Sequence, residues 1–358
     1  MRASSTSITR LAAAGAVAAL ALAGCASGGD APAATTSPSS TATATPPAEE
    51  SPTAEPSPTL PANASPLSGR AGGEGKRVLI VKYDNTPNAQ PHSGLTKADV
   101  VYVEEVEYGL TRIAAVFSTS LPKTVGPVRS ARISDLELFA NYQDAAFAYS
   151  GAQHRLRPLI AASDLVDVSG DQGPYGYFRD GSRPAPYNFM GQPEKLLQRA
   201  KGSAVAQDIG FEFSLDAPAD GRAVRAVKAS YPSSSAKFVY NAKTGRFDVS
   251  LNGRPARATE GGIQHATTVV IQYVKQYDSG FGDKFGGRTP KEDTVGTGYG
   301  WVLRDGQAYK VRWTRADEAA PTQFVGANGQ VVPFKPGQVW VVLVNRKEPA
   351  TFAWAKAS

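Results

Sequence analysis

Apolar and polar residues follow two different patterns along this 358-residue chain. Between residues 77 and 202, apolar runs of strand length are interleaved with segments of helical period. Strands are expected at 77–81, 99–103, 111–118 and 144–150, and helices at 134–142, 153–163 and 192–200. Ser134 is placed to cap the first helix, and Pro193 fits the first turn of the last. Interleaved strands and helices are typical of a mixed α/β domain.

After about residue 210 the helical period is lost, and short strand-like runs follow one another. They are expected at 238–240, 246–251, 267–273, 300–304, 308–313, 323–325, 331–334 and 339–344. Asn252-Gly253 and Asp305-Gly306 are strong hairpin signals between such runs. We therefore expect an α+β fold, with a mixed α/β N-terminal domain at 76–205 and a mostly β C-terminal domain at 206–358.

The N-terminal residues have the features of a processing signal. Arg2 and Arg10 form a positively charged N-terminal region. It is followed by an Ala/Leu run at 11–22, which is too short to span a bilayer. The run ends in Leu-Ala-Gly-Cys, which matches the bacterial lipobox. We expect residues 1–24 to be a lipoprotein signal peptide and Cys25 to carry the lipid; an ordinary signal peptide is the alternative. Because Cys25 is the only cysteine, an internal disulfide and a cysteine-based metal site are excluded.

Residues 25–75 are rich in Ser, Thr, Pro and Ala and have no hydrophobic period. Such a segment buries too little apolar surface to offset its ordering entropy, so we expect a disordered tether. The predicted location is the extracytoplasmic face of the cell membrane, which the protein contacts through its N-terminal lipid.

The charge of the chain is only mildly positive. The formal net charge is +6 and the pI is about 9.2. Removal of the signal peptide takes away two arginines and leaves +4. This charge, on an exported protein, does not indicate a nucleic-acid partner.

Charged residues gather next to apolar runs between residues 82 and 135. The candidate ligand-binding residues are Asp84, Asn85, Asp99, Arg112, Arg129, Ser130 and Arg132. Guanidinium groups bind phosphate and carboxylate bidentately, which predicts an anionic or polyhydroxylated ligand. Alternatively, the arginines form ion pairs on the same surface. Their candidate partners are Glu104, Glu105, Glu107 and Asp135.

Metal and nucleophilic chemistry have weaker signals. Asp84, Asp99 and Asp135 could together hold a hard divalent cation, although each also fits a turn or a cap. The three histidines are not spaced for zinc, and a glycine-rich phosphate loop and an HExxH motif are absent. We therefore predict no metal and no cofactor. Ser93 with His154 and an aspartate is a conceivable triad, without the G-x-S-x-G elbow that would support it.

A series of ordered motifs carries a resemblance to a known family. They are V-K-x-D-N at 81–85, S-G-L-x-K-A-D at 93–99, T-R at 111–112, G-P-V-R-S-A-R at 126–132, Y-N-A-K-T-G-R-F at 240–247, a GxGxGW-like run at 296–301, A-P-T-Q-F at 320–324 and P-G-Q-V-W at 336–340. With them the chain resembles the YerB-type bacterial lipoprotein family, which contains a domain of unknown function. The resemblance implies a membrane-anchored envelope protein without an established activity. The chain departs from the family at Tyr187-Asn188, where a His more often precedes the Asn.

A second likeness concerns the same N-terminal stretch. Its strand ends and Arg-rich turn are similar to those of LytR–CpsA–Psr glycopolymer transferases, whose motifs are not reproduced literally. This likeness implies that Asp84 and Asp99 bind Mg²⁺ and that Arg129 and Arg132 bind a polyprenyl pyrophosphate. The predicted function is therefore that of a cell-envelope lipoprotein binding a wall polymer or a wall-building enzyme. The alternative is an enzyme acting on an anionic or lipid-linked envelope glycan.

Overall fold

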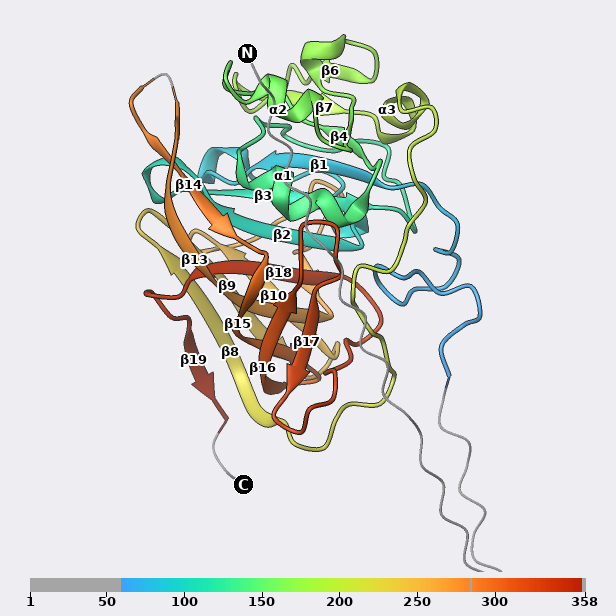
Figure 1. The fold of residues 1–358 in the computed structure, drawn as a ribbon, viewed down its shortest axis with the longest axis vertical. Helices are drawn as coiled ribbons and strands as arrows, with labels where there is room; N and C mark the ends of the chain where they lie inside the picture. Colours follow the sequence, from blue (N-terminus) through green and yellow to red (C-terminus); the bar gives the residue numbers. More distant parts are fainter. Residues whose placement is uncertain (1–58, 284, 356–358) are drawn as a thin grey trace, which may run out of the picture. The chain divides into compact units, whose positions relative to one another are not determined.

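A large sheet runs through the part of the chain that the computed structural model describes, residues 59–283 and 285–355 (Figure 1). Its N-terminal strands are β1 (Leu79–Asp84), β2 (Val100–Glu105), β3 (Thr111–Phe117), β4 (Ala146–Ala148) and β5 (Val166–Asp167). β3 lies between β1 and β2 and is antiparallel to both, while β4 pairs in parallel with β1 and β5 with β4. β1 and β3 are buried along their whole length, as expected for central strands.

The sheet continues into the C-terminal half. β2 pairs in parallel with β18 (Val339–Asn345), and β18 pairs in parallel with β13 (Thr268–Gly282). β15 (Gly296–Arg304), β16 (Gln307–Arg315) and β17 (Gln323–Gly326) follow as antiparallel neighbours. The sheet therefore crosses the boundary predicted at residue 205, which lies between α3 (Pro193–Arg199) and β8 (Arg222–Tyr231).

A second group of strands packs against this sheet. β8 pairs with β9 (Ser234–Asn241) and β9 with β10 (Arg246–Leu251), all antiparallel. β11 (Arg254–Pro255), β12 (His265–Ala266) and β19 (Thr351–Trp354) border them. Buried residues alternate with exposed or half-buried ones along β10, so that one face points to a core. Phe238 of β9 contacts Trp340 of β18 edge-on, with ring centroids 5.6 Å apart, and the apolar residues between the two layers form that core.

The helices are short. α1 (Ser134–Phe139), α2 (Arg157–Ala161) and α3 have between five and seven residues. The 3-10 turns are η1 (Pro87–Ala89), η2 (Leu95–Lys97), η3 (Glu107–Gly109), η4 (Ala140–Tyr142) and η5 (Gly170–Gln172). The remaining strands are β6 (Tyr177–Arg179), β7 (Phe189–Gly191) and β14 (Arg288–Asp293). Leu138 and Phe139 of α1 join Ile80 and Ala114 in a second core, on the other face of β1 and β3.

The described chain is mostly β, and the mixed α/β domain expected at 76–205 is not clearly formed. The helix expected at 134–142 is split into α1 and η4, and that expected at 153–163 is reduced to α2. The physical reason is the topology: β2 and β3 form an antiparallel hairpin joined by η3, and the β1–β2 connection crosses β3 through the short turns η1 and η2 instead of a long helix. In the C-terminal half, the strand expected at 331–334 has only isolated bridges, and β8 was not expected.

The end of the predicted tether belongs to the folded part. Leu67 is fully buried in the second core, and Ser65 and Ser68 are buried beside it. These contacts attach the segment around Leu67 to the core, so the tether predicted at 25–75 does not extend to residue 75. The predicted signal peptide, Cys25 and the predicted tether up to residue 58 lie outside the described residues. Within the described residues, no helix is long and apolar enough to cross a bilayer.

Candidate anion-binding site

Asp84 and Arg112 face each other across two neighbouring strands. Asp84 ends β1, Arg112 is the second residue of β3, and the antiparallel register places them directly opposite. Directly opposite residues in an antiparallel pair have side chains on the same face of the sheet. The Arg112 Nη1 atom lies 3.5 Å from Asp84 Oδ1.

A loop segment brings Arg129 to the same place. Along β1, β4 pairs only with Leu79–Val81. Beyond that point the segment 127–129 is the neighbour of β1. The Asp84 N–H donates to the Pro127 carbonyl at 3.0 Å, and the Arg129 N–H donates to the Lys82 carbonyl at 2.9 Å. This backbone pairing puts Arg129 Nε 2.6 Å from Asp84 Oδ2. Two arginines therefore share one fully buried carboxylate.

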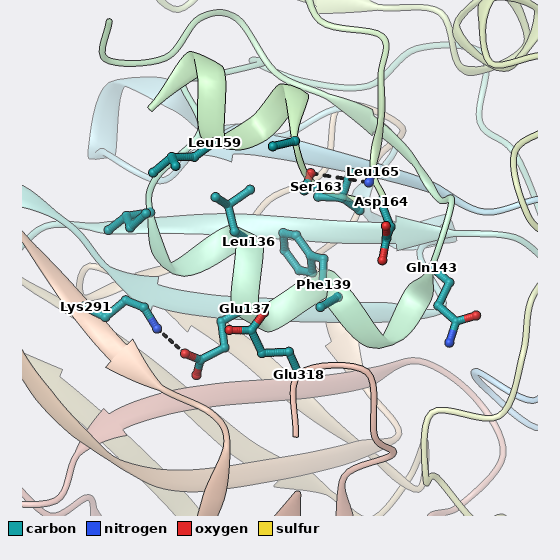
Figure 2. Close-up of a pocket in the computed structure, with 13 residues that line it drawn as sticks. Leu136, Glu137, Phe139, Gln143, Leu159, Ser163, Asp164, Leu165, Lys291 and Glu318 are labelled. Carbon is teal, nitrogen blue, oxygen red and sulfur yellow. Dashed lines mark hydrogen bonds and ion pairs between the residues drawn. The ribbon is translucent and has the colours of Figure 1, made fainter. Parts of the chain in front are cut away.

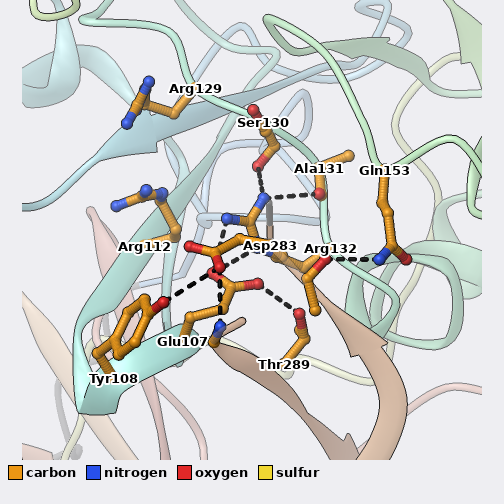
Figure 3. Close-up of polar contacts among 12 residues, drawn as sticks. Glu107, Tyr108, Arg112, Arg129, Ser130, Ala131, Arg132, Gln153, Asp283 and Thr289 are labelled. Atoms are coloured by element: carbon orange, nitrogen blue, oxygen red, sulfur yellow. Dashed lines mark hydrogen bonds and ion pairs between the residues drawn. The ribbon is translucent and has the colours of Figure 1, made fainter. Parts of the chain in front are cut away.

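Arg132 has a carboxylate of its own. Its Nε and Nη2 atoms donate to Glu107 Oε2 at 3.0 and 2.7 Å, and Thr289 donates its hydroxyl to the other oxygen of Glu107 (Figure 3). Arg132 also donates its backbone N–H to Asp135 at 2.6 Å. For Arg132, the ion-pair alternative predicted from the sequence is what the geometry shows.

These arginines open onto one cavity. Its volume is about 760 Å³, and Arg112, Arg129, Ser130 and Arg132 line it together. The β13–β14 hairpin contributes Phe281, Asp283 and Thr289 from the other half of the chain, and η3 contributes Tyr108. Figure 3 shows the side chains of Arg112 and Arg129 beside the Arg132–Glu107 pair.

Burial sets the electrostatics of the site. Burial lowers the pKa of Arg112 to about 10, with Asp84 opposing and Arg132 and Arg129 adding to the shift. Burial alone would raise the pKa of Asp84, but Arg112, two hydrogen bonds from Thr86 and Arg129 hold it below its usual value. Arg112 therefore stays cationic and Asp84 anionic at neutral pH. Yet Nε and Nη1 of Arg112 have no hydrogen-bond partner among the described residues, although the side chain is only 7% exposed.

Asp99 lies outside this site, which corrects the sequence prediction. It precedes β2, and β1 and β2 run in the same direction, so Asp99 and Asp84 lie at opposite ends of the strands. Six residues of strand separate these ends by roughly 20 Å. Asp99 instead accepts hydrogen bonds from Ser68 Oγ and Arg70 Nη2, each at 2.6 Å, and from two backbone N–H groups. Asp99 therefore holds Ser68 and Arg70 against the sheet.

The proposed group of three aspartates is therefore not assembled. Asp84 is bound by arginines, Asp99 is at the other end of the sheet, and Asp135 accepts from Lys82 Nζ at 2.8 Å. In residues 59–283 and 285–355, no group of three or more His, Cys, Asp or Glu side chains is placed to hold a metal ion. The metal-binding part of the transferase likeness has no counterpart in this geometry.

Asn85 and Ser93 have structural contacts away from the cavity. Asn85 donates to the Thr111 hydroxyl at 2.8 Å, and Ser93 Oγ accepts from the Thr259 hydroxyl at 2.9 Å. His154 lines the cavity, but Ser93 does not, so the triad considered from the sequence is not formed.

Lys82 was missed in the sequence analysis. It is fully buried and donates to Glu104 and Asp135, so those two acids pair with a lysine rather than with arginines. Burial lowers the pKa of Lys82, and Asp135 opposes that shift. Nearby, burial raises the pKa of Glu292 well above its ordinary value. Lys82 and Asp84 are two residues apart in a strand and so share a face, which is the signal that could have found Lys82.

A smaller hollow lies beside α1 and α2. Its volume is about 390 Å³, and Leu136, Phe139 and Leu159 give it an apolar lining (Figure 2). The Glu137–Lys291 ion pair borders it. It contains none of the residues predicted to bind a ligand.

Comparison with known proteins agrees with the resemblance seen in the sequence. Residues 67–206 match the model of the N-terminal domain of a protein family of unknown function (DUF3048), and residues 226–341 match the model of its C-terminal domain. A Bacillus subtilis (strain 168) protein named "Putative lipoprotein YerB" is 26% identical over 290 residues, which are 78% of this chain and 84% of that protein. The crystal structure of YerB from Bacillus subtilis has the same fold, with a TM-score of 0.69 and 23% identity over 81% of this chain and 99% of that one. The chain is thus a YerB-like member of the DUF3048 family.

Proposed function

We propose that this protein is a membrane-anchored envelope lipoprotein whose arginine cavity binds the anionic groups of a cell-wall polymer. The observation that carries the proposal is Arg112, a buried guanidinium with two nitrogens that lack hydrogen-bond partners among the described residues. An unsatisfied buried polar group costs about 1–3 kcal/mol. A phosphate or carboxylate group in the cavity would supply acceptors to these guanidinium nitrogens as charge-assisted hydrogen bonds.

The charge balance around Arg112 supports an anionic ligand. Arg112 and Arg129 share only Asp84, whereas Arg132 is matched by Glu107. Arg129 is 29% exposed at its side chain, so that a ligand entering from solvent meets it before the buried Arg112. Arg112 and Arg129 are therefore the cationic part of the cavity, whereas Arg132 with Glu107 forms part of its wall.

The size of the cavity fits a polar ligand of moderate length. A volume of about 760 Å³ lies within the range of about 300–1,000 Å³ that is usual for small-ligand sites. Tyr108 and Phe281 line the cavity beside the arginines and add ring surfaces against which sugar or glycerol units could pack. The relative's lipoprotein name supports an envelope location, where wall polymers carry phosphate or carboxylate groups.

Binding to defined polymers tests the proposal. The lipidated full-length protein in detergent would be titrated with poly(glycerol phosphate), oligogalacturonate and neutral dextran. Arg112→Gln should weaken binding to an anionic polymer at least about tenfold, as expected for a lost charge-assisted contact. Arg225→Gln is the matched control, because Arg225 is exposed on β8 outside the cavity. Equal binding of dextran and the anionic polymers, or unchanged binding by Arg112→Gln, would reject the proposal.

A further inference from the structure

A third hollow, here called the Trp313 slot, lies in the C-terminal half between β13 and β15. It is lined by Tyr273, Lys275, Asp293, Thr297, Tyr299 and Trp313, among others, and its volume is about 390 Å³. β13 and β15 pair only as far as Gln272 and Gly300. Beyond that point β13 pairs with β14 from Lys275, while β15 continues along β16. The slot is the space opened where the two strands separate.

The glycines of the 296–301 motif make this space possible. Gly298 is opposite Trp313 in the β15–β16 register, and a Cβ on Gly298 would lie 2.5 Å from the indole nitrogen. The indole crosses the bare strand and donates its Nε1–H to the Tyr273 carbonyl at 3.0 Å. Trp313 is 2% exposed, so its ring closes the bottom of the slot. Gly298 therefore leaves room for an aromatic floor between the two strands.

The walls and the rim offer complementary surfaces. Tyr299 is 63% exposed, and Tyr273 lines the other side of the slot. At the rim, Lys275 Nζ lies 3.6 Å from Asp293 Oδ2, which is longer than a good hydrogen bond. Arg346 adds a second cation. The slot thus combines exposed ring surface with a charged rim.

We propose that the Trp313 slot binds a single sugar ring of a glycan. A sugar ring has an apolar face that packs on a tyrosine ring and hydroxyls that both donate and accept hydrogen bonds. Lys275, Arg346 and Asp293 supply donors and an acceptor at the rim, which a purely apolar ligand would leave unused. This site is separate from the arginine cavity, shares no lining residue with it, and does not depend on the function proposed for it.

Titration of the full-length protein in detergent with defined trisaccharides tests the slot. The probes are chitotriose, which carries N-acetylhexosamines, maltotriose, which carries plain hexoses, and trigalacturonate, which carries carboxylates. Comparison of the three distinguishes a wall-backbone sugar from other glycans. Tyr299→Ala should weaken binding of the preferred trisaccharide about tenfold, and Tyr299→Phe should retain it because the ring remains.

Two controls locate the effect. Tyr175→Ala removes another exposed tyrosine with a lysine beside its ring, far from the slot in sequence and absent from its lining, and should bind like the unchanged protein. Arg112→Gln should leave chitotriose and maltotriose binding unchanged, which separates this site from the arginine cavity. The proposal is overturned if none of the three sugars binds at about 10 mM, or if Tyr299→Ala binds as tightly as the unchanged protein.

Discussion

Arg112 and Asp84 stand opposite each other on adjacent antiparallel strands, 3.5 Å apart, yet they do not satisfy each other. Asp84 Oδ1 accepts two hydrogen bonds from Thr86 at 2.7 Å, and Oδ2 forms an ion pair with Arg129 Nε at 2.6 Å without hydrogen-bond geometry. Nε and Nη1 of Arg112 have no hydrogen-bond partner among the described residues. Arg132 and Glu107, in the same cavity, do satisfy each other. In this cavity, Arg112 is therefore available to bind a ligand, whereas Arg132 forms a structural ion pair.

This contrast predicts that two matched substitutions change the free energy of unfolding by different amounts. Arg112→Gln should change the free energy of unfolding by about 1 kcal/mol or less, because the lost guanidinium was poorly hydrogen-bonded. Arg132→Gln should destabilise by about 3 kcal/mol, because it leaves Glu107 buried without its cation. Urea denaturation of both variants gives the comparison. Equal losses would show that Arg112 is a structural ion-pair partner.

Asp84→Asn should be among the most damaging single changes in the site. It removes the carboxylate shared by two guanidinium groups and leaves both without a counter-charge. Breaking a buried pair in this way costs roughly 3–5 kcal/mol. The measurement is the thermal melting temperature, with Asp180→Asn in the exposed 180–182 turn as the control. If added poly(glycerol phosphate) restores part of the lost stability, the anion replaces the carboxylate.

His92 predicts a loss of stability in mild acid. Its Nε2 lies 2.7 Å from the Asp84 carbonyl oxygen, and burial lowers the pKa of His92 from 6.5 to about 4. Since the unfolded chain binds the proton first, stability should be complete above pH 6.5 and fall as the pH drops towards 4. The total is on the order of 3 kcal/mol. Asp84, whose folded pKa is lowered, adds a loss with the same sign at more acidic pH.

The variant His92→Gln separates this effect from that of other groups. Glutamine can donate to the same carbonyl but does not titrate, so the slope of stability between pH 6.5 and 4 should become flatter. Chemical denaturation at several pH values measures the slope. A slope identical to that of the unchanged protein would assign the acid sensitivity to other residues.

The contacts of Asp99 predict the first residue of the protease-resistant fragment. Asp99→Asn weakens the hold on Ser68 and Arg70, which bind the carboxylate at 2.6 Å. Limited proteolysis of the unchanged protein should leave a resistant fragment that begins before Leu67. In Asp99→Asn the resistant fragment should begin nearer Lys76. N-terminal sequencing of the resistant fragments identifies their first residues. If both proteins give the same first residue, the Asp99 contacts are not needed and Leu67 alone holds the segment.

Cys25 predicts the location of the protein. Cys25→Ala should abolish labelling by a fatty-acid analogue and release the protein from the membrane fraction. Cys25 is the only cysteine, so no other thiol can take the lipid. Membrane fractionation of both forms is the measurement. Retention of Cys25→Ala as firmly as the unchanged protein would contradict the lipobox prediction.

The sequence by itself determined the features that depend only on residues close together along the chain. Apolar runs predicted β1, β2, β3 and β18 within a few residues, because strands at the centre of a sheet are buried on both faces. Local motifs also identified the family, and the Arg112, Arg129 and Arg132 set that lines the cavity.

Only the tertiary structure decided which of these residues meet. Asp84 and Asp99 each border an apolar run, but the parallel direction of β1 and β2 puts them at opposite ends of the sheet. The cavity wall from β13–β14 and the pairing of β2 with β18 join residues that lie far apart in the sequence, such as Arg112 with Phe281 and Val100 with Val339. Such pairings depend on the register and direction of strands, which a hydrophobic pattern with a period of two does not specify.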